Sequence, residues 1–180
     1  HIRFELSEND DEPWEDRLLV GTLPPVPWDK SLQSKLGSGS KQAIHLLSEA
    51  GWLHRRIEEF IARIQGEANA GSVSRALAGA FSAELASYHD LLCQMELHVT
   101  SSKDATLRSL LIHSRQPVRR LYQLAMLADR LALLRGPFLL HSLQRSLAHG
   151  DHRHVELVQS LLMQAASPWW DMVFTWTTQG

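Results

Sequence analysis

Cysteine is nearly absent from this sequence, and the single residue, Cys93, cannot form a disulfide within the chain. The sequence therefore carries no mark of an oxidising compartment. Cys93 lies in an apolar helical run beside Leu91, Leu92 and Met95. We therefore expect it to be a buried, inert thiol.

Long apolar runs and an excess of basic residues are missing as well. No run approaches the ~20 apolar residues that span a bilayer, and residues 1–15 lack the basic-then-apolar pattern of a signal peptide. The net charge of −2 argues against nucleic-acid binding, which leaves a basic footprint, and against an electrostatic membrane anchor. We expect a cytoplasmic or nuclear protein that binds neither nucleic acid nor membrane. Because the chain begins at His1 and ends directly after an aromatic segment, we also expect a piece of a larger protein.

The first 40 residues differ in composition from the rest. Residues 3–16 hold seven acidic side chains against Arg3 alone, and residues 13–28 hold four of the seven prolines. Proline lacks a backbone donor and fixes φ, so a regular helix cannot run through this stretch. We expect residues 1–40 to form an irregular, acidic, Pro-rich lead-in and residues 41–180 to form a helical domain.

From Lys41 onward, apolar residues recur with the period of α-helices. Leu53, Ile57, Phe60 and Ile61 share one helical face. Comparable stripes follow in residues 77–95, 121–134, 138–147 and 155–162. Stop and start signals separate the segments, at Gly66–Gly71, Thr100–Asp104, Gln116-Pro117, Gly136-Pro137, His149–Asp151 and Ser167-Pro168. The pattern predicts an all-α bundle or array of about seven mostly antiparallel helices.

Two histidine groups could carry metal chemistry. His89-Asp90 is the dipeptide that all-helical HD-type metal phosphohydrolases place at a two-metal centre, and His54 and Asp129 could complete it. Adjacent residues of a helix point about 100° apart, so two exposed polar side chains are the simpler interpretation.

His149, His152 and His154 flank Asp151, but a predicted helix break separates the first histidine from the others and no cysteine is near. A solvated loop with Asp151 as a helix cap is the simpler explanation. The sequence has no Gly-rich phosphate loop and no nucleophile elbow. We therefore predict a chain that is not an enzyme and uses no cofactor or metal.

Charged and aromatic side chains are the candidates for a partner interface. The first long helix carries a charged face, arginines cluster around Pro117, and two tryptophans start the last segment. Arginine and tryptophan are enriched at interface hot spots. The candidate interface residues are His54, Arg55, Arg56, Glu59, Arg115, Arg119, Arg120, Trp169 and Trp170.

Three stretches resemble the gamma-tubulin complex component family, in particular its component 3 branch. LSEAGWLHRRIEEF (47–60) resembles the Leu-Ser-Glu-Leu-Gly-Trp-Leu segment of that branch, and residues 76–96 look like the helix that follows it. The later landmarks are collinear with the family: Leu107, Arg108, Pro117, Gly136, Gly150, Asp151, Pro168, Trp176 and Gly180. Pro137 stands where the family has a second glycine. Residues 1–40 match the family pattern poorly, with EDRLLVGT (15–22) as a degenerate echo of it.

The resemblance covers residues 41–180 and implies the N-terminal helical domain of such a component. It implies a non-catalytic scaffold that pairs laterally with other components, whereas gamma-tubulin would bind a second domain absent from this sequence. The assembled complex would nucleate microtubules in the cytoplasm, at the cytoskeleton and at a microtubule-organising centre such as a centrosome or spindle pole. An unrelated helical array of the vesicle-tethering or cullin-like kind is the alternative.

Overall fold

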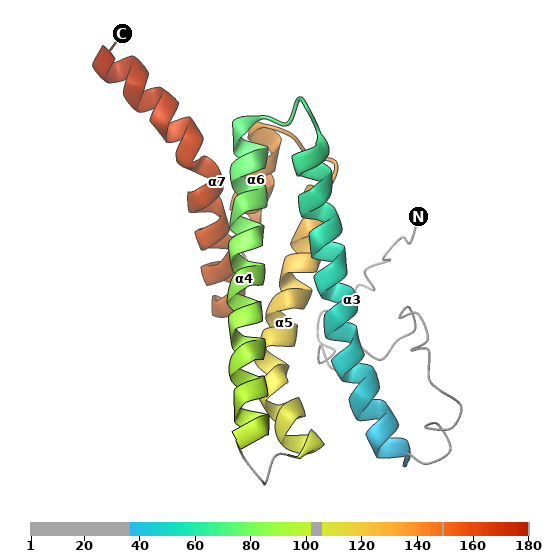
Figure 1. Ribbon diagram of the computed structural model, residues 1–180. Coiled ribbons are helices and arrows are strands. Elements are labelled where there is room, and N and C mark those ends of the chain that lie inside the picture. The colour runs from blue at the N-terminus through green and yellow to red at the C-terminus, as the bar shows by residue number, and fades with distance from the viewer. Residues whose placement is uncertain (1–36, 102–105, 149, 180) are drawn as a thin grey trace. The chain divides into compact units, whose positions relative to one another are not determined.

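The computed structural model describes residues 37–101, 106–148 and 150–179. In these ranges the chain forms five α-helices and no strand, so the all-α prediction is confirmed and the prediction of about seven helices is wrong. The helices are α3 (Ser38–Gly66), α4 (Ser72–Ser101), α5 (Leu107–Leu131), α6 (Pro137–Ser146) and α7 (His152–Gln179). The second half of α3 and the whole of α5 and α7 run opposite to α4 in Figure 1.

Two prolines that we predicted to start helices lie inside helices instead. Pro117 falls within α5 and Pro168 within α7, so four predicted segments merge into two. A proline inside a helix removes one backbone hydrogen bond and costs about 3 kcal/mol. Packing can offset a local cost of this size, and in α5 the residues directly after Pro117 bury an apolar face that begins at Val118.

The observed helix starts follow the predicted signals at two places. Gly136 adopts a φ of +56°, which favours glycine, and Pro137 is the first residue of α6. Asp151 caps α7, where its Oδ1 accepts from the backbone N–H of Arg153 at 3.1 Å. At α5 the cap is Thr106, whose hydroxyl accepts from the backbone N–H of Ser109, while the predicted cap lies at residue 104, outside the described residues.

The core is formed by one apolar face from each of the five helices. At its centre the rings of Phe60 and Phe81 lie 5.0 Å apart at 50°, joining α3 to α4. The largest fully buried side chains are Leu53, Ile57, Leu77, Phe81, Leu121, Leu124, Leu127, Leu131, Leu139, Leu143, Leu157 and Leu161. The stripes predicted on α3 and α5 are therefore confirmed as core.

The stripe predicted on α4 is fully buried as far as Leu85, and Tyr88 still packs against the core while partly buried. Beyond it Leu92 is 41% exposed, and Cys93 is exposed rather than buried as we predicted. Leu91 and Met95 of this end of α4 face α5, whereas Cys93, about 200° from Leu91 around the helix, lies on another side.

The contacts divide the chain into two compact units, residues 1–49 and residues 50–180. Residues 37–49 of the first unit are described, and from Ser38 they form the beginning of α3. The predicted boundary at residue 40 stays a prediction, and residues 1–36 of the expected lead-in lie outside the described residues. Among the described helices, none has the length and apolar character needed to cross a membrane.

Candidate functional site

The C-terminal part of α7 carries the most conspicuous exposed apolar surface of the described residues. The last buried residue of α7 is Ala165, and beyond it the helix leans away from α4 in Figure 1. We call the following set, in which only Met163 precedes Ala165, the aromatic end of α7: Met163, Trp169, Trp170, Met172, Phe174 and Trp176. Its aromatic side chains are between 45% and 78% exposed. Such a surface is typical of a site that another protein element covers.

The area of this surface is comparable with one side of a protein interface. Aromatic side chains bury 150–250 Å² each, so the four exposed here present roughly 400–600 Å² to solvent. The largest apolar patch on a typical monomer is about 300–600 Å², and a standard interface buries about 800 Å² on each partner. With the two methionines, the aromatic end approaches that interface size.

The apolar residues of the aromatic end occupy two different sides of α7. With 3.6 residues per turn, Trp169, Met172 and Trp176 continue the side on which Ala165 is buried. Met163, Trp170 and Phe174 recur at i, i+7 and i+11 on another side.

An ordinary surface helix has one apolar stripe. From the sequence we predicted only Trp169 and Trp170 of this set as interface residues. The apolar residues on a second side of the helix, Met163, Trp170 and Phe174, were the signal that could have indicated the others. Asp171 is the only charged residue from 157 to 179, so the surface is nearly neutral.

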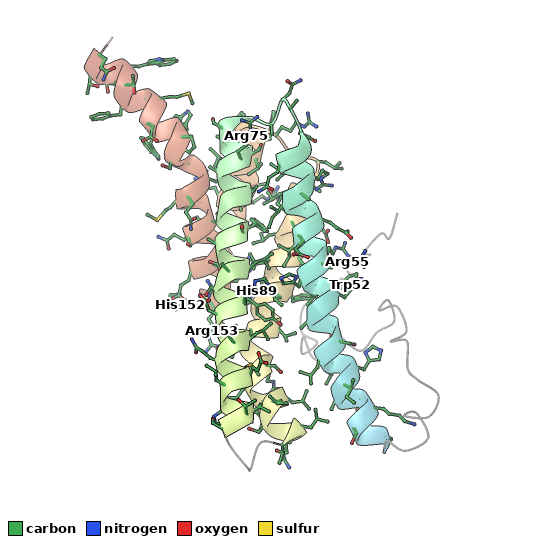
Figure 2. The ribbon with its side chains drawn as sticks, in the orientation of Figure 1. Trp52, Arg55, Arg75, His89, His152 and Arg153 are labelled. Carbon is green, nitrogen blue, oxygen red and sulfur yellow. The ribbon has the colours of Figure 1, made fainter. Side chains whose placement is uncertain are left out.

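The charged face predicted on α3 divides into an exposed and an internal part. Arg55 and Glu59 are 80% and 69% exposed and form a pair of 3.4 Å along the helix, and Figure 2 shows Arg55 on the outer side of α3. Arg56 instead crosses to α5, where its Nε and Nη2 donate to the two carboxylate oxygens of Asp129 at 2.9 and 2.7 Å. The Arg56 guanidinium also lies 5.0 Å from the ring centre of Trp52. Arg56 therefore has a structural role in joining two helices.

Arg120 and Arg119, from the arginine cluster around Pro117, are also engaged within the fold. Arg120 donates through Nε and Nη2 to Glu84 of α4 at 2.8 and 3.0 Å. Arg119 donates to Oδ2 of Asp151, the residue that caps α7, at 2.9 Å. Arg115 is exposed. The first two arginines hold α5 against its neighbours, which is a structural reason for their positions.

Of the residues proposed for a metal phosphohydrolase site, only the side chains of His54 and His89 lie close together. The Nε2 atoms of His54 and His89 lie 2.8 Å apart, and Figure 2 shows His89 between α4 and α3. Asp129 is engaged through both oxygens by Arg56. Within the described ranges no group of three or more His, Cys, Asp or Glu side chains converges on a point that could hold a metal ion.

The histidines around Asp151 do not form a cluster in the part that the structure describes. His154 is buried, and His152 points along the helix to Glu156 at 3.5 Å. His149 lies outside the described residues. The prediction that Asp151 is a helix cap is confirmed.

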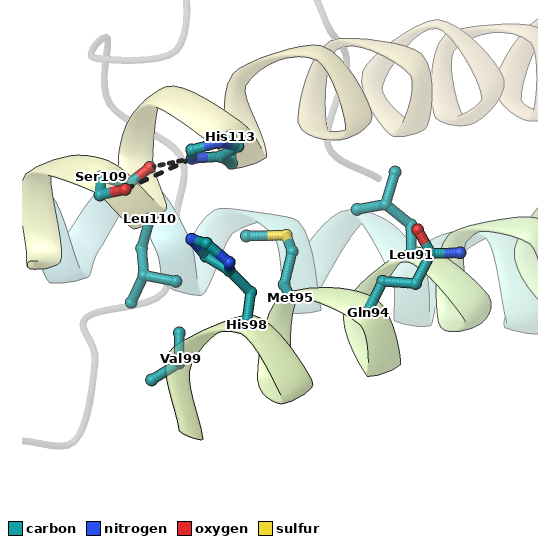
Figure 3. Close-up of a pocket in the computed structure, with 8 residues that line it drawn as sticks. All are labelled: Leu91, Gln94, Met95, His98, Val99, Ser109, Leu110 and His113. Carbon is teal, nitrogen blue, oxygen red and sulfur yellow. Dashed lines mark hydrogen bonds between the residues drawn. The ribbon is translucent and has the colours of Figure 1, made fainter. Parts of the chain in front are cut away.

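A groove of about 340 Å³ lies between the C-terminal end of α4 and the N-terminal end of α5 (Figure 3). Leu91, Met95 and Leu110 form its apolar lining. His113 donates through Nδ1 to the backbone carbonyl of Ser109 at 2.7 Å, which fixes its ring at the rim. We predicted Met95 to be a core residue of the α4 stripe; it lines this groove instead.

One buried acidic side chain has a raised pKa. Glu49 of α3 is only 5% exposed, and its Oε2 has no hydrogen-bond partner among the described residues. Burial disfavours the carboxylate and raises the pKa of Glu49 from 4.5 to about 7. The folded state therefore binds this proton more tightly than the unfolded state.

This pKa shift makes stability depend on pH. Glu49 contributes stability below pH 4.5, and that contribution is lost as the pH rises through the folded pKa of about 7. Glu49→Gln is therefore expected to stabilise the protein at pH 8, by up to about 3 kcal/mol, and to have little effect near pH 4.5. Urea denaturation at both values measures this, with Glu59→Gln as a control at an exposed glutamate. Equal effects of Glu49→Gln at both pH values would contradict the assignment.

Comparisons with known proteins agree on one family. The family model described as "Gamma tubulin complex component N-terminal" matches residues 25–180, so the match starts within the predicted lead-in. Gamma-tubulin complex component 3 of Arabidopsis thaliana is 28% identical over 161 residues, which cover 81% of this chain and 19% of that protein. Gamma-tubulin complex component 3 of Homo sapiens is 28% identical over 144 residues, which cover 74% of this chain and 16% of that protein. The chain thus spans less than a fifth of the length of these relatives.

Proposed function

Because this chain belongs to the gamma-tubulin complex component N-terminal family, we propose that it is a non-catalytic scaffold domain of a gamma-tubulin complex. In this proposal it pairs laterally with other components of the complex, and the assembly nucleates microtubules. The observation that carries the proposal is the family match over residues 25–180, and it favours this function over an unrelated helical array. The place of action is the cytoskeleton, at a microtubule-organising centre.

The aromatic end of α7 supports the proposal on physical grounds. A scaffold domain acts by presenting a surface that a partner buries, and a permanent interface is apolar and poor in charge. The aromatic end has both properties, since its side chains are between 45% and 78% exposed and Asp171 is its only charged neighbour. We propose it as the interface, with Trp169 and Trp170 as the members that the sequence analysis named. The exposed Arg55–Glu59 pair of α3 is a more polar candidate, worth less because surface ion pairs contribute little.

A binding experiment separates this function from direct binding of gamma-tubulin. The purified chain is mixed with the N-terminal domain of a second gamma-tubulin complex component, and separately with gamma-tubulin, and each mixture is analysed by analytical ultracentrifugation. We expect a complex with the component and none with gamma-tubulin, since the gamma-tubulin site is proposed to lie in another domain. A stable complex with gamma-tubulin alone would overturn the proposal.

A further inference from the structure

Two imidazole rings from different helices face each other between α3 and α4. The Nε2 atoms of His54 and His89 are 2.8 Å apart, and the ring centres are 4.8 Å apart at 42°. His54 is 17% exposed, whereas His89 is exposed. Without a bound ligand, one nitrogen donates a hydrogen bond and the other accepts it.

The surroundings of His54 favour the tautomer that a metal ion needs. Its Nδ1 lies 3.4 Å from Oε2 of Glu58, one turn further along α3. A carboxylate this close to Nδ1 favours a proton on that nitrogen, which leaves the lone pair on Nε2. Histidines that bind metals generally place their other ring nitrogen against a carboxylate, a backbone carbonyl or water, which fixes the ring and raises the basicity of the ligating nitrogen. The Nε2 lone pair of His54 therefore accepts the Nε2–H of His89. A cation bound between the rings requires His89 to carry its proton on Nδ1 instead, which is the other neutral tautomer of the same ring.

We propose that His54 and His89 bind a divalent transition-metal cation of the zinc class, with water at the remaining positions. Imidazole is a good ligand for Zn²⁺ and its neighbours Ni²⁺ and Cu²⁺. Zinc–nitrogen bonds are about 2.0–2.1 Å long, so two such ligands in tetrahedral geometry stand about 3.3 Å apart. The rings need to separate by roughly 0.5 Å from their present contact to reach that spacing, and the exposed ring of His89 has room for this movement.

The site would connect two helices that already share a core contact. The two histidines are 35 residues apart in the sequence and come together only in the folded chain. A cation bound by both therefore stabilises the folded state selectively. Because the described residues offer no third ligand here, we expect weaker binding than at a structural zinc site, which has four protein ligands. This inference does not rest on the function proposed above.

The proposal is tested by titrating the untagged chain with ZnCl₂ alone. Binding is measured by isothermal titration calorimetry, and the effect on stability is measured by thermal unfolding. We expect one Zn²⁺ per chain, a rise in the unfolding midpoint, and no response to MgCl₂. His54→Gln and His89→Gln should each weaken binding by at least about tenfold, whereas His141→Gln, at an exposed histidine of α6, should not.

Imidazole NMR signals of the unmodified chain provide a second measurement that does not depend on how the variants fold. Zn²⁺ should shift the signals of His54 and His89 before those of the other histidines. Binding that survives His89→Gln, signals that shift elsewhere first, or the absence of saturable 1:1 binding would each overturn the proposal.

Discussion

Replacing Phe81 by alanine is expected to lower the free energy of unfolding by about 3–5 kcal/mol. Phe81 is fully buried in α4, and its ring packs against Phe60 of α3 with centres 5.0 Å apart. The substitution removes apolar contacts and leaves a cavity where two helices meet. Since a domain is stabilised by only about 5–15 kcal/mol in total, a loss of this size approaches unfolding. Urea denaturation monitored by circular dichroism measures it.

Phe138→Ala is the matched control, because it makes the same chemical change on a side chain that is 70% exposed in α6. The expected change in unfolding free energy is within about 0.5 kcal/mol. The difference between the two variants isolates the effect of burial from the change of residue type. If both variants lost the same stability, the placement of Phe81 in the core would be wrong.

The sequence predicted the helices from the apolar period, and it predicted their ends best where one residue controls the backbone locally. Gly136 at positive φ and Asp151 as a cap are of this kind. Pro117 and Pro168 were misjudged because proline is compatible both with the first turn and, at a cost, with the interior of a helix. Which of the two occurs depends on the packing of the flanking residues against other helices, which the sequence does not display.

The candidate interface could be predicted only in part, for a related reason. The sequence marked Arg56, Arg119 and Arg120 as exposed charges, but the structure pairs them with Asp129, Asp151 and Glu84 on other segments. Those partners are 32 residues or more away along the chain, so no local pattern indicates them. Trp169 and Trp170 were predicted as interface residues because tryptophan is enriched at interface hot spots. Their exposure became evident only once the end of the packed core was known.

The second prediction with a large expected effect concerns pairing through the aromatic end of α7. Trp170→Ser combined with Phe174→Ser is expected to weaken pairing with the partner component by at least about 100-fold, since interface hot spots contribute 2 kcal/mol or more each. Both side chains are more than 60% exposed and lie on the side of α7 that does not continue the core. The fold should therefore be retained, with an unchanged unfolding midpoint. Analytical ultracentrifugation with the second component measures the dissociation constant.

Phe138→Ser provides the control for a general loss of exposed aromatic surface, because Phe138 is 70% exposed on α6. Pairing should be unaffected by that variant if the aromatic end of α7 is the contact. Pairing that persists in the folded Trp170/Phe174 variant would remove this side of α7 as the interface, while the family-based function would stand. In that case the remaining apolar side, formed by Trp169, Met172 and Trp176, becomes the surface to test. The 3.6-residue period places the two sets of side chains in different directions, but the rings of Trp169 and Trp170 lie 4.8 Å apart. Phe174 and Trp176 are therefore the positions that assign the two sides of the helix separately.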